Sequence, residues 1–165
     1  LGDAAILKVL IKILSENKIK VIKLNTYNPE LTLKRGVYTK IKPTYDEKSE
    51  ILKGIKALKK INSYNHTQAI VVRNNKIISL EKRKGTKEMI RSIPKSKNHK
   101  GILIKLPKLK QDLRVDLPTI GLETFKDCKK AGIKGIVIKS NQNIILNKKK
   151  CIEYANKNSL FLVSI

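Results

Sequence analysis

The chain of 165 residues has no tryptophan and few aromatic residues, which make up 4% of the total. Proteins that read single-stranded nucleic acid stack bases on aromatic rings and on arginine. Only five of the 37 basic residues here are arginine, and the lysines are spread along the whole chain. The net charge of +24 therefore does not by itself indicate nucleic-acid binding, and a basic nucleic-acid-binding module is kept only as an alternative.

Cysteine is also scarce, with Cys128 and Cys151 as the only two. They form no CxxC pair and have no zinc-ligand spacing, which argues against a disulfide framework or a zinc site. We expect both thiols to be reduced and buried on separate helices, as is typical of the cytosol. The chain begins without methionine, and we expect it to be a fragment that lacks an upstream segment.

No apolar run reaches the ~20 residues that would span a bilayer. The opening stretch LGDAAILKVLIKILSEN carries charged and polar residues inside its apolar part, which is not the pattern of a signal peptide. Acidic residues are few, 13 against 37 basic ones. Such an excess of positive charge favours contact with a phosphorylated ligand or an anionic membrane leaflet.

Apolar spacing along the chain predicts alternating helices and strands. The predicted helices are 4–16, 44–61, 85–93, 120–132 and 148–158. The predicted strands are 19–24, 68–72, 76–81, 101–107, 135–139, 143–147 and 160–165, and 25–43 reads as a polar loop. Two pairs of strands look like hairpins. The pattern predicts the fold class α/β, as a three-layer α/β/α sandwich with a mixed sheet.

A ladder of charges, Asp112, Arg114 and Asp116, lies in the stretch KLPKLKQDLRVDLPTIG. In an extended segment these side chains would share one face, with three apolar residues turned inward. Arg114 would then reach either carboxylate. The carboxylates would lie ~13 Å apart, so a single Mg²⁺ would take only one of them.

Pro118 is expected to end that strand, since it cannot donate a ladder hydrogen bond. Thr119 would then lie at a helix start, which suits phosphate, and Lys105 and Lys108 add positive charge upstream. These groups are the parts needed for phosphoryl transfer or pyrophosphate cleavage. The alternative is an ion ladder on a solvated edge strand, which contributes little.

The stretch GILIKLPKLKQDLRVDLPTIGLETFKDCKKAGIKGIVIKS closely resembles the signature of the UDP-2,3-diacylglucosamine pyrophosphatase family of lipid A biosynthesis, the metal-dependent type unrelated to calcineurin-like phosphoesterases. GDAAILKVL, PTYDEKSEILKGIKALKKI, TQAIVV and LEKRKGT precede it in the expected order. The run QDLRVDLPTIG is the most specific part. The resemblance spans essentially the whole chain.

This resemblance implies hydrolysis of UDP-2,3-diacylglucosamine to UMP and 2,3-diacylglucosamine 1-phosphate (lipid X), with Mg²⁺ as cofactor. It implies two domains with the ligand between them. Residues 1–18 would be a connector helix from a missing N-terminal domain, and 19–165 the C-terminal catalytic α/β domain, an α/β/α sandwich. The expected location is the cytoplasm, with contact to anionic inner-membrane lipid as a further expectation and no nucleic-acid partner.

The resemblance also implies the site residues. The catalytic aspartate is expected at Asp116 first and Asp112 second, with Arg114 beside them. Residues expected to bind substrate are Lys105, Lys108, Gln111, Thr119, Gln68, Gly85 and Thr86. Residues expected to bind metal are Asp116, Asp112 and Glu81.

Several positions depart from the family pattern: Leu109-Lys110 replaces a turn, Thr67-Gln68 replaces Gly-Gln, and two further changes flank Gly85-Thr86. The residue before Gly85-Thr86 and the residue after it are usually acidic in the family, whereas here they are Lys84 and Lys87. From its place at a strand end, Glu81 either faces a site beside Gly85-Thr86 or is an ordinary surface charge. These departures support an alternative function, a non-catalytic ligand-binding domain of the same fold.

Overall fold

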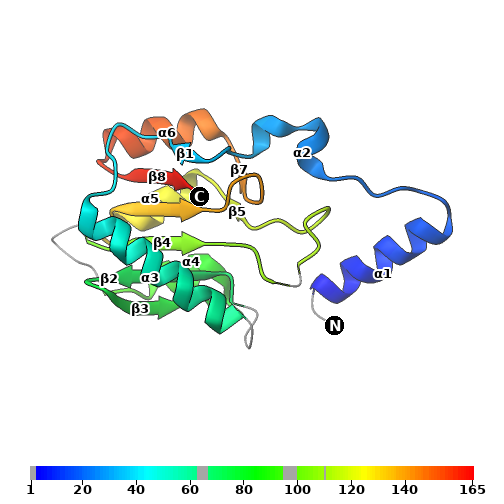
Figure 1. The fold of residues 1–165 in the computed structure, drawn as a ribbon, viewed down its shortest axis with the longest axis horizontal. Coiled ribbons are helices and arrows are strands. Elements are labelled where there is room, and N and C mark those ends of the chain that lie inside the picture. The colour runs from blue at the N-terminus through cyan, green and yellow to red at the C-terminus, as the bar shows by residue number, and fades with distance from the viewer. Residues whose placement is uncertain (1–2, 63–66, 95–99, 110) are drawn as a thin grey trace.

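A mixed sheet of six strands, in the order β1-β8-β6-β4-β2-β3, forms the centre of the fold (Figure 1). The computed structural model describes residues 3–62, 67–94, 100–109 and 111–165. Strands β4, β6 and β8 are parallel, whereas β2 is antiparallel to both β4 and β3. Strand β3 therefore runs in the same direction as β4. The strands are β1 (Gly36–Val37), β2 (Ala69–Arg73), β3 (Lys76–Leu80), β4 (Ile102–Lys105), β6 (Gly135–Ile138) and β8 (Phe161–Ser164).

Helices cover both faces of the sheet, as predicted. Alternate residues of each strand face opposite sides, so that Leu103 packs into one buried cluster and Ile104 into the other. The cluster around Leu103 contains side chains of α4 (Gly85–Arg91), α5 (Leu122–Lys130) and α6 (Lys148–Lys157), and the other contains those of α3 (Tyr45–Asn62). The α/β/α sandwich with a mixed sheet is thus confirmed.

Several local signals in the sequence produce the predicted elements. Thr44 and Glu47 form the capping box of α3, with the Thr44 N–H donating to Glu47 Oε2 at 2.8 Å and the Glu47 N–H to Thr44 Oγ1 at 3.3 Å. Asn74 and Asn75 both take positive φ and join β2 to β3 as a hairpin. Gly132, with φ of 71°, follows the end of α5.

The predicted strand 19–24 is wrong. Residues 19–23 form no strand, and Leu24 begins a short helix, α2 (Leu24–Tyr27). This segment alternates in polarity but pairs with no strand, and Ile19 and Ile22 remain exposed. The predicted loop 25–43 contains α2, the 3-10 turn η1 (Pro29–Leu31) and β1.

The second predicted hairpin is also wrong. Strand β7 (Ile144–Ile145) pairs not with β6 but with β5 (Thr119–Ile120), in a separate parallel two-stranded sheet. Asn141 takes a positive φ and the Lys139 N–H is held by the side chain of Asn143, so the chain turns away from β6 instead of returning along it.

Helix α1 (Asp3–Glu16), predicted over 4–16, lies apart from the sheet and beside the loop that follows β4 (Figure 1). Its role as a connector stays a prediction. Among the helices that the structure describes, none has the length and apolar character to cross a bilayer. Exposed apolar residues follow one side of α1, at Ile6, Val9, Leu10 and Ile13.

The two cysteines are free and buried, as predicted. Cys128 lies on α5 and Cys151 on α6. Burial raises the pKa of the Cys151 thiol to about 11 and that of Cys128 further. Both thiols are therefore protonated and inert near neutral pH.

We expect Gly54→Ala to destabilise the fold. A Cβ at this position of α3 would collide with Ile104 and Val72 of the sheet below it. Such overpacking costs about 1–3 kcal/mol, more than the ~1 kcal/mol by which alanine exceeds glycine in a helix. Urea denaturation should show the loss, while the exposed control Lys53→Ala stays within about 0.5 kcal/mol of the wild type.

Candidate active site

The candidate site lies where β4, β6 and β3 end, at one edge of the sheet. Ligands of α/β proteins commonly bind outside the carboxyl ends of parallel strands. Lys105 is the last residue of β4, and Glu81 directly follows β3. Because β3 and β4 point the same way, these two side chains meet at this edge, which we call the carboxyl edge.

A partly buried chain of hydrogen bonds joins the residues there. Lys105 Nζ donates to Thr86 Oγ1 at 2.9 Å and to the Thr119 carbonyl at 3.0 Å. The Thr86 hydroxyl donates to Glu81 Oε1 at 2.5 Å, and the Gln68 N–H donates to Glu81 Oε2 at 3.1 Å. We call Lys105, Thr86, Glu81 and Gln68 the Lys105 cluster.

Lys105 is an ionisable group in a largely dry place, since it is only 7% exposed. Burial lowers its pKa, Glu81 opposes this, and the nearby charge of Lys108 lowers it further. An ammonium group has three N–H donors. Two of them are used, and the third has no acceptor among the residues that the structure describes.

The cluster also contains an unused acceptor. The side-chain oxygen of Gln68 is buried with no hydrogen-bond partner among the described residues. Leaving such an atom unpaired costs about 1–3 kcal/mol. A free donor on Lys105 and a free acceptor on Gln68 are what a polar ligand would satisfy.

Gly85 gives the cluster its local backbone shape. It opens α4 with φ of 81°, a conformation that favours glycine, and a Cβ built there would meet nothing within 4 Å. The predicted helix 85–93 has no side-chain cap, and Thr86 does not supply one. Its hydroxyl turns instead to Glu81 and Lys105.

The predicted ladder 112–117 is not a strand. The N–H groups of Val115 and Asp116 both donate to the Asp112 carbonyl, at 3.1 and 2.9 Å, so the segment forms a tight turn. Residues four apart in such a turn lie about 5–6 Å from each other rather than ~13 Å. Val115 is exposed rather than packed inward, and Pro118 precedes strand β5 instead of ending a strand.

Asp112 and Arg114 form a strong ion pair within this turn. Arg114 donates Nη2 to Asp112 Oδ2 at 2.6 Å and Nε to both carboxylate oxygens, and its backbone N–H donates to Oδ1. These hydrogen bonds lower the pKa of Asp112 to about 2. Lys8 of α1 adds to the effect, so the pair lies close to that helix.

The three carboxylates predicted to bind metal differ in whether their oxygens already accept hydrogen bonds from the protein. The oxygens of Glu81 and of Asp112 are already used by protein donors. Asp116 has no side-chain partner in the described part of the chain, and it is half-buried. The described residues contain no group of three metal-binding side chains. Of the three carboxylates, Asp116 is therefore the one that no described protein donor engages.

The remaining predicted residues are placed as follows. The Gln111 side chain accepts from the Lys108 N–H at 2.8 Å, which closes the turn after β4. The Thr119 hydroxyl donates to the Leu117 carbonyl, and its own carbonyl anchors Lys105. Helix α5 begins at Leu122 rather than at Thr119.

One residue of this edge was missed from the sequence. Asn143 is fully buried, donates to the Lys105 carbonyl at 3.2 Å and accepts from the Lys139 N–H at 2.9 Å. It thus ties the ends of β4 and β6 together. Its position was read as the start of a strand, and the only available signal was an amide residue at a place expected to be apolar.

A cavity of about 270 Å³ opens beside the turn after β4. Apolar residues of α3, of the segment after β4 and of the C-terminus line it together with three lysines. The lining includes Leu58, Lys59, Leu106, Lys108, Lys139 and Ile165. The carboxyl edge therefore combines cationic and apolar surface.

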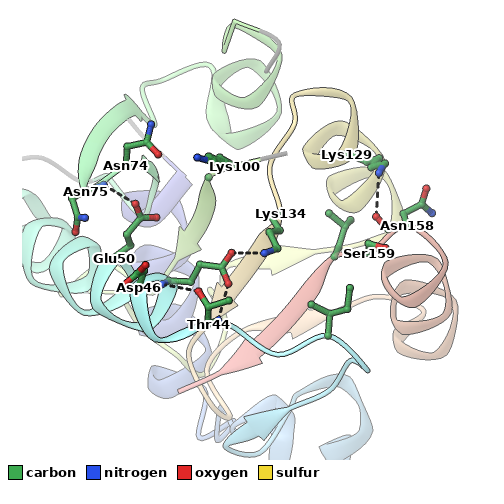
Figure 2. Close-up of a pocket in the computed structure, with 14 residues that line it drawn as sticks. Thr44, Asp46, Glu50, Asn74, Asn75, Lys100, Lys129, Lys134, Asn158 and Ser159 are labelled. Carbon is green, nitrogen blue, oxygen red and sulfur yellow. Dashed lines mark hydrogen bonds and ion pairs between the residues drawn. The ribbon is translucent and has the colours of Figure 1, made fainter. Parts of the chain in front are cut away.

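A larger groove of about 650 Å³ lies at the opposite edge of the sheet (Figure 2). Several of its charged groups pair with other groups of the protein. Glu47 pairs with Lys134 at 2.7 Å, and although burial raises its pKa, the bonds from Lys134 and Thr44 leave it lowered. Glu50 accepts from the Asn75 N–H at 2.6 Å. Two of the three carboxylates that line this groove are thus engaged by protein donors.

The fold and the carboxyl edge together define an α/β domain with a polar, phosphate-compatible site at the strand ends. Residues 34–163 match the family described as the LpxI C-terminal domain. This match covers most of the chain, and the chain belongs to that family.

The chain is also similar to a curated protein, the UDP-2,3-diacylglucosamine pyrophosphatase LpxI of Caulobacter vibrioides (strain ATCC 19089 / CIP 103742 / CB 15). The two are 27% identical over 172 residues. The alignment covers 99% of this chain and 61% of the relative. The chain thus spans about three-fifths of the length of that protein.

We expect the Asp112–Arg114 pair to persist until strongly acidic pH. The pKa of Asp112 is lowered from its unfolded value of about 3.9 to about 2. The stabilisation is therefore complete above the unfolded value and is lost as the pH falls through about 2. An NMR titration of the Asp112 carboxyl carbon should show a midpoint near 2, and a midpoint near 4 would contradict the pair.

Proposed function

We propose that this chain is the catalytic part of an enzyme that hydrolyses the pyrophosphate bond of UDP-2,3-diacylglucosamine. The products would be UMP and 2,3-diacylglucosamine 1-phosphate, a step of lipid A biosynthesis. Family membership and the name of the Caulobacter relative support this substrate. The observation that carries the proposal is the buried Lys105, with a donor to spare at the carboxyl edge.

The proposed reaction is a displacement at phosphorus. The oxygen of a water molecule attacks one phosphorus, the bond from that phosphorus to the bridging oxygen breaks, and the other phosphate leaves with the electron pair. Lys105 and Arg114 would stabilise the negative charge that develops. Asp112 would hold the Arg114 guanidinium in place, since it engages that side chain through several hydrogen bonds.

Asp116 suits either of two roles in this scheme. No described residue engages its carboxylate. The carboxylate would therefore accept the proton of the attacking water or hold Mg²⁺. Mg²⁺ bound there would neutralise charge on the diphosphate. Sites of this kind need only one or two protein carboxylates, because phosphate and water supply the other ligands.

We also propose that an upstream domain completes the site. The chain spans 61% of its Caulobacter relative, and the matched family domain begins at residue 34, after α1. In this proposal residues 1–18 connect the two domains and residues 19–165 carry the catalytic groups. The protein would act in the cytoplasm, at the inner membrane where its lipid substrate lies.

A non-catalytic ligand-binding domain is the second candidate. It is favoured by Lys84 and Lys87, which stand where the family usually has acids, and by the engagement of both Glu81 oxygens. UMP release from UDP-2,3-diacylglucosamine by the full-length protein distinguishes the two. We expect release that depends on Mg²⁺, whereas tight binding without release would establish the binding domain.

A further inference from the structure

Charge is unevenly distributed between the two edges of the sheet. The carboxyl edge carries basic residues from the ends of four elements: Lys59, Lys82, Arg83, Lys84, Lys108 and Lys139. Of the acids there, Glu81 and Asp112 are engaged by protein donors, which leaves Asp116 and Glu88. The groove at the opposite edge is lined by three acids and three lysines, Asp46, Glu47, Glu50, Lys100, Lys129 and Lys134, so its formal charges balance. The carboxyl edge is thus the strongly cationic one.

Exposed aliphatic side chains accompany these cations. Leu109, which follows Lys108 in the turn after β4, is 66% exposed. On β3, the outermost strand, Ile77, Ile78 and Leu80 are also exposed. A shallow groove of about 810 Å³ runs between β3 and α4, and it ends at Lys82, Arg83 and Lys84.

The topology explains why β3 is only partly covered. Helix α3 packs mainly on β2 and β4, whereas β3 is the outermost strand. Val71 and Val72 of β2 pair with Ser79 and Ile77, so Ile78 is an extra residue in β3, and Ile77 and Leu80 lie on one face with Ser79 on the other. Exposed aliphatic residues on an edge strand are unusual unless a partner covers them.

The combination of aliphatic and cationic side chains indicates which kind of partner covers this surface. A second copy of the chain, pairing strand to strand along β3, would bring together two chains that each carry a net charge of +24, and this like charge opposes the pairing. Clusters of lysine and arginine around exposed aliphatic residues match an anionic lipid surface, where the cations meet headgroups and the aliphatic side chains enter the acyl boundary.

We propose that the carboxyl edge docks on an anionic lipid bilayer, through Leu109 and β3 inserted at the interface and the surrounding basic residues against headgroups. Docking in this orientation turns the Lys105 cluster toward the membrane. If the proposed function holds, an acylated substrate then reaches the cluster without passing through water. The docking itself depends only on the surface residues.

Vesicle co-sedimentation of the full-length protein tests this docking. Vesicles of phosphatidylcholine with phosphatidylglycerol should bind the protein, and vesicles of phosphatidylcholine alone should not. The double variant Lys82→Gln/Lys84→Gln should weaken binding about thirty-fold, because each lysine near an anionic surface contributes roughly a factor of five. The matched control is Lys53→Gln/Lys56→Gln, two exposed lysines of α3.

A second pair of variants tests the aliphatic contact. Leu109→Ser should weaken binding several-fold, and Leu52→Ser should not, although Leu52 on α3 is as exposed, at 69%. Equal weakening by test and control variants would mean adsorption by overall charge and would overturn the proposal. Failure to bind phosphatidylglycerol vesicles, or a dimer that Leu109→Ser dissociates, would overturn it as well.

The outcome is separable from that of the proposed function. UMP release by the wild-type protein is measured on substrate dispersed in detergent, without a bilayer. Release without face-specific vesicle binding would refute the docking and leave the hydrolysis standing. Face-specific vesicle binding without UMP release would support the docking and refute the proposed hydrolysis.

Discussion

Replacing Lys105 with methionine should abolish UMP release by the full-length protein and destabilise this domain by about 3–5 kcal/mol. The change removes the cation that compensates the buried Glu81 through the Thr86 hydroxyl. It also leaves the Thr119 carbonyl without its donor. Urea denaturation and an assay of UMP release measure the two effects.

A double variant separates the structural effect from the chemical one. Lys105→Met/Glu81→Gln removes both charges, and it should recover most of the lost stability because no buried charge is left uncompensated. Turnover should stay absent, because the ammonium group that faces the ligand is still missing. A double variant that regained turnover with its stability would show that Lys105 only supports the fold.

Asp116→Asn should lower turnover by about 10²–10⁴-fold, the usual contribution of a general base. The free energy of unfolding should change by no more than about 0.5 kcal/mol, because the Asp116 side chain has no partner in the described chain. Asp112→Asn is the matched control. It removes the charge that binds the Arg114 guanidinium, so we expect poorer ligand affinity with a smaller loss of turnover.

The opposite pattern would contradict this assignment. If Asp112→Asn abolished turnover while Asp116→Asn kept it, the essential carboxylate would be the one already paired with Arg114. Asparagine preserves the shape of each side chain, so a loss of stability would not obscure the result. Isothermal titration with the lipid product gives the affinities independently of turnover.

Much of the fold was predictable because its signals are local. The capping box at Thr44 and Glu47, the apolar stripe of α3 and the Asn74-Asn75 turn each depend on residues close in sequence. The parallel core strands read as short apolar runs, as expected for strands buried on both faces. These signals agree with one another, so the layer architecture followed from them.

The errors have a common physical cause. Residues 112–117 alternate in polarity like a strand, yet the Asp112 side chain accepts the backbone N–H of Arg114 and favours a turn. Residues 19–24 alternate as well, but no strand lies beside them. Alternation shows that a strand is compatible with the sequence, whereas pairing decides whether one forms.

The Lys105 cluster could not be derived from spacing, since Gln68, Glu81, Thr86 and Lys105 belong to different elements. Resemblance to the family named all four, and the register of β2, β3 and β4 explains why they meet. Asn143 was missed, because its role depends on the ends of two strands that are distant in sequence. Long-range contacts of this kind leave little trace in one sequence.

The central claim is that a diphosphate binds at the carboxyl edge, and an NMR titration of the ¹⁵N-labelled chain with uridine diphosphate tests it most directly. We predict shifts of the amide resonances of Gly85, Thr86 and Leu106 that saturate with ligand. Shifts confined to the opposite groove, at Glu50, Asn75 and Lys134, would contradict the account.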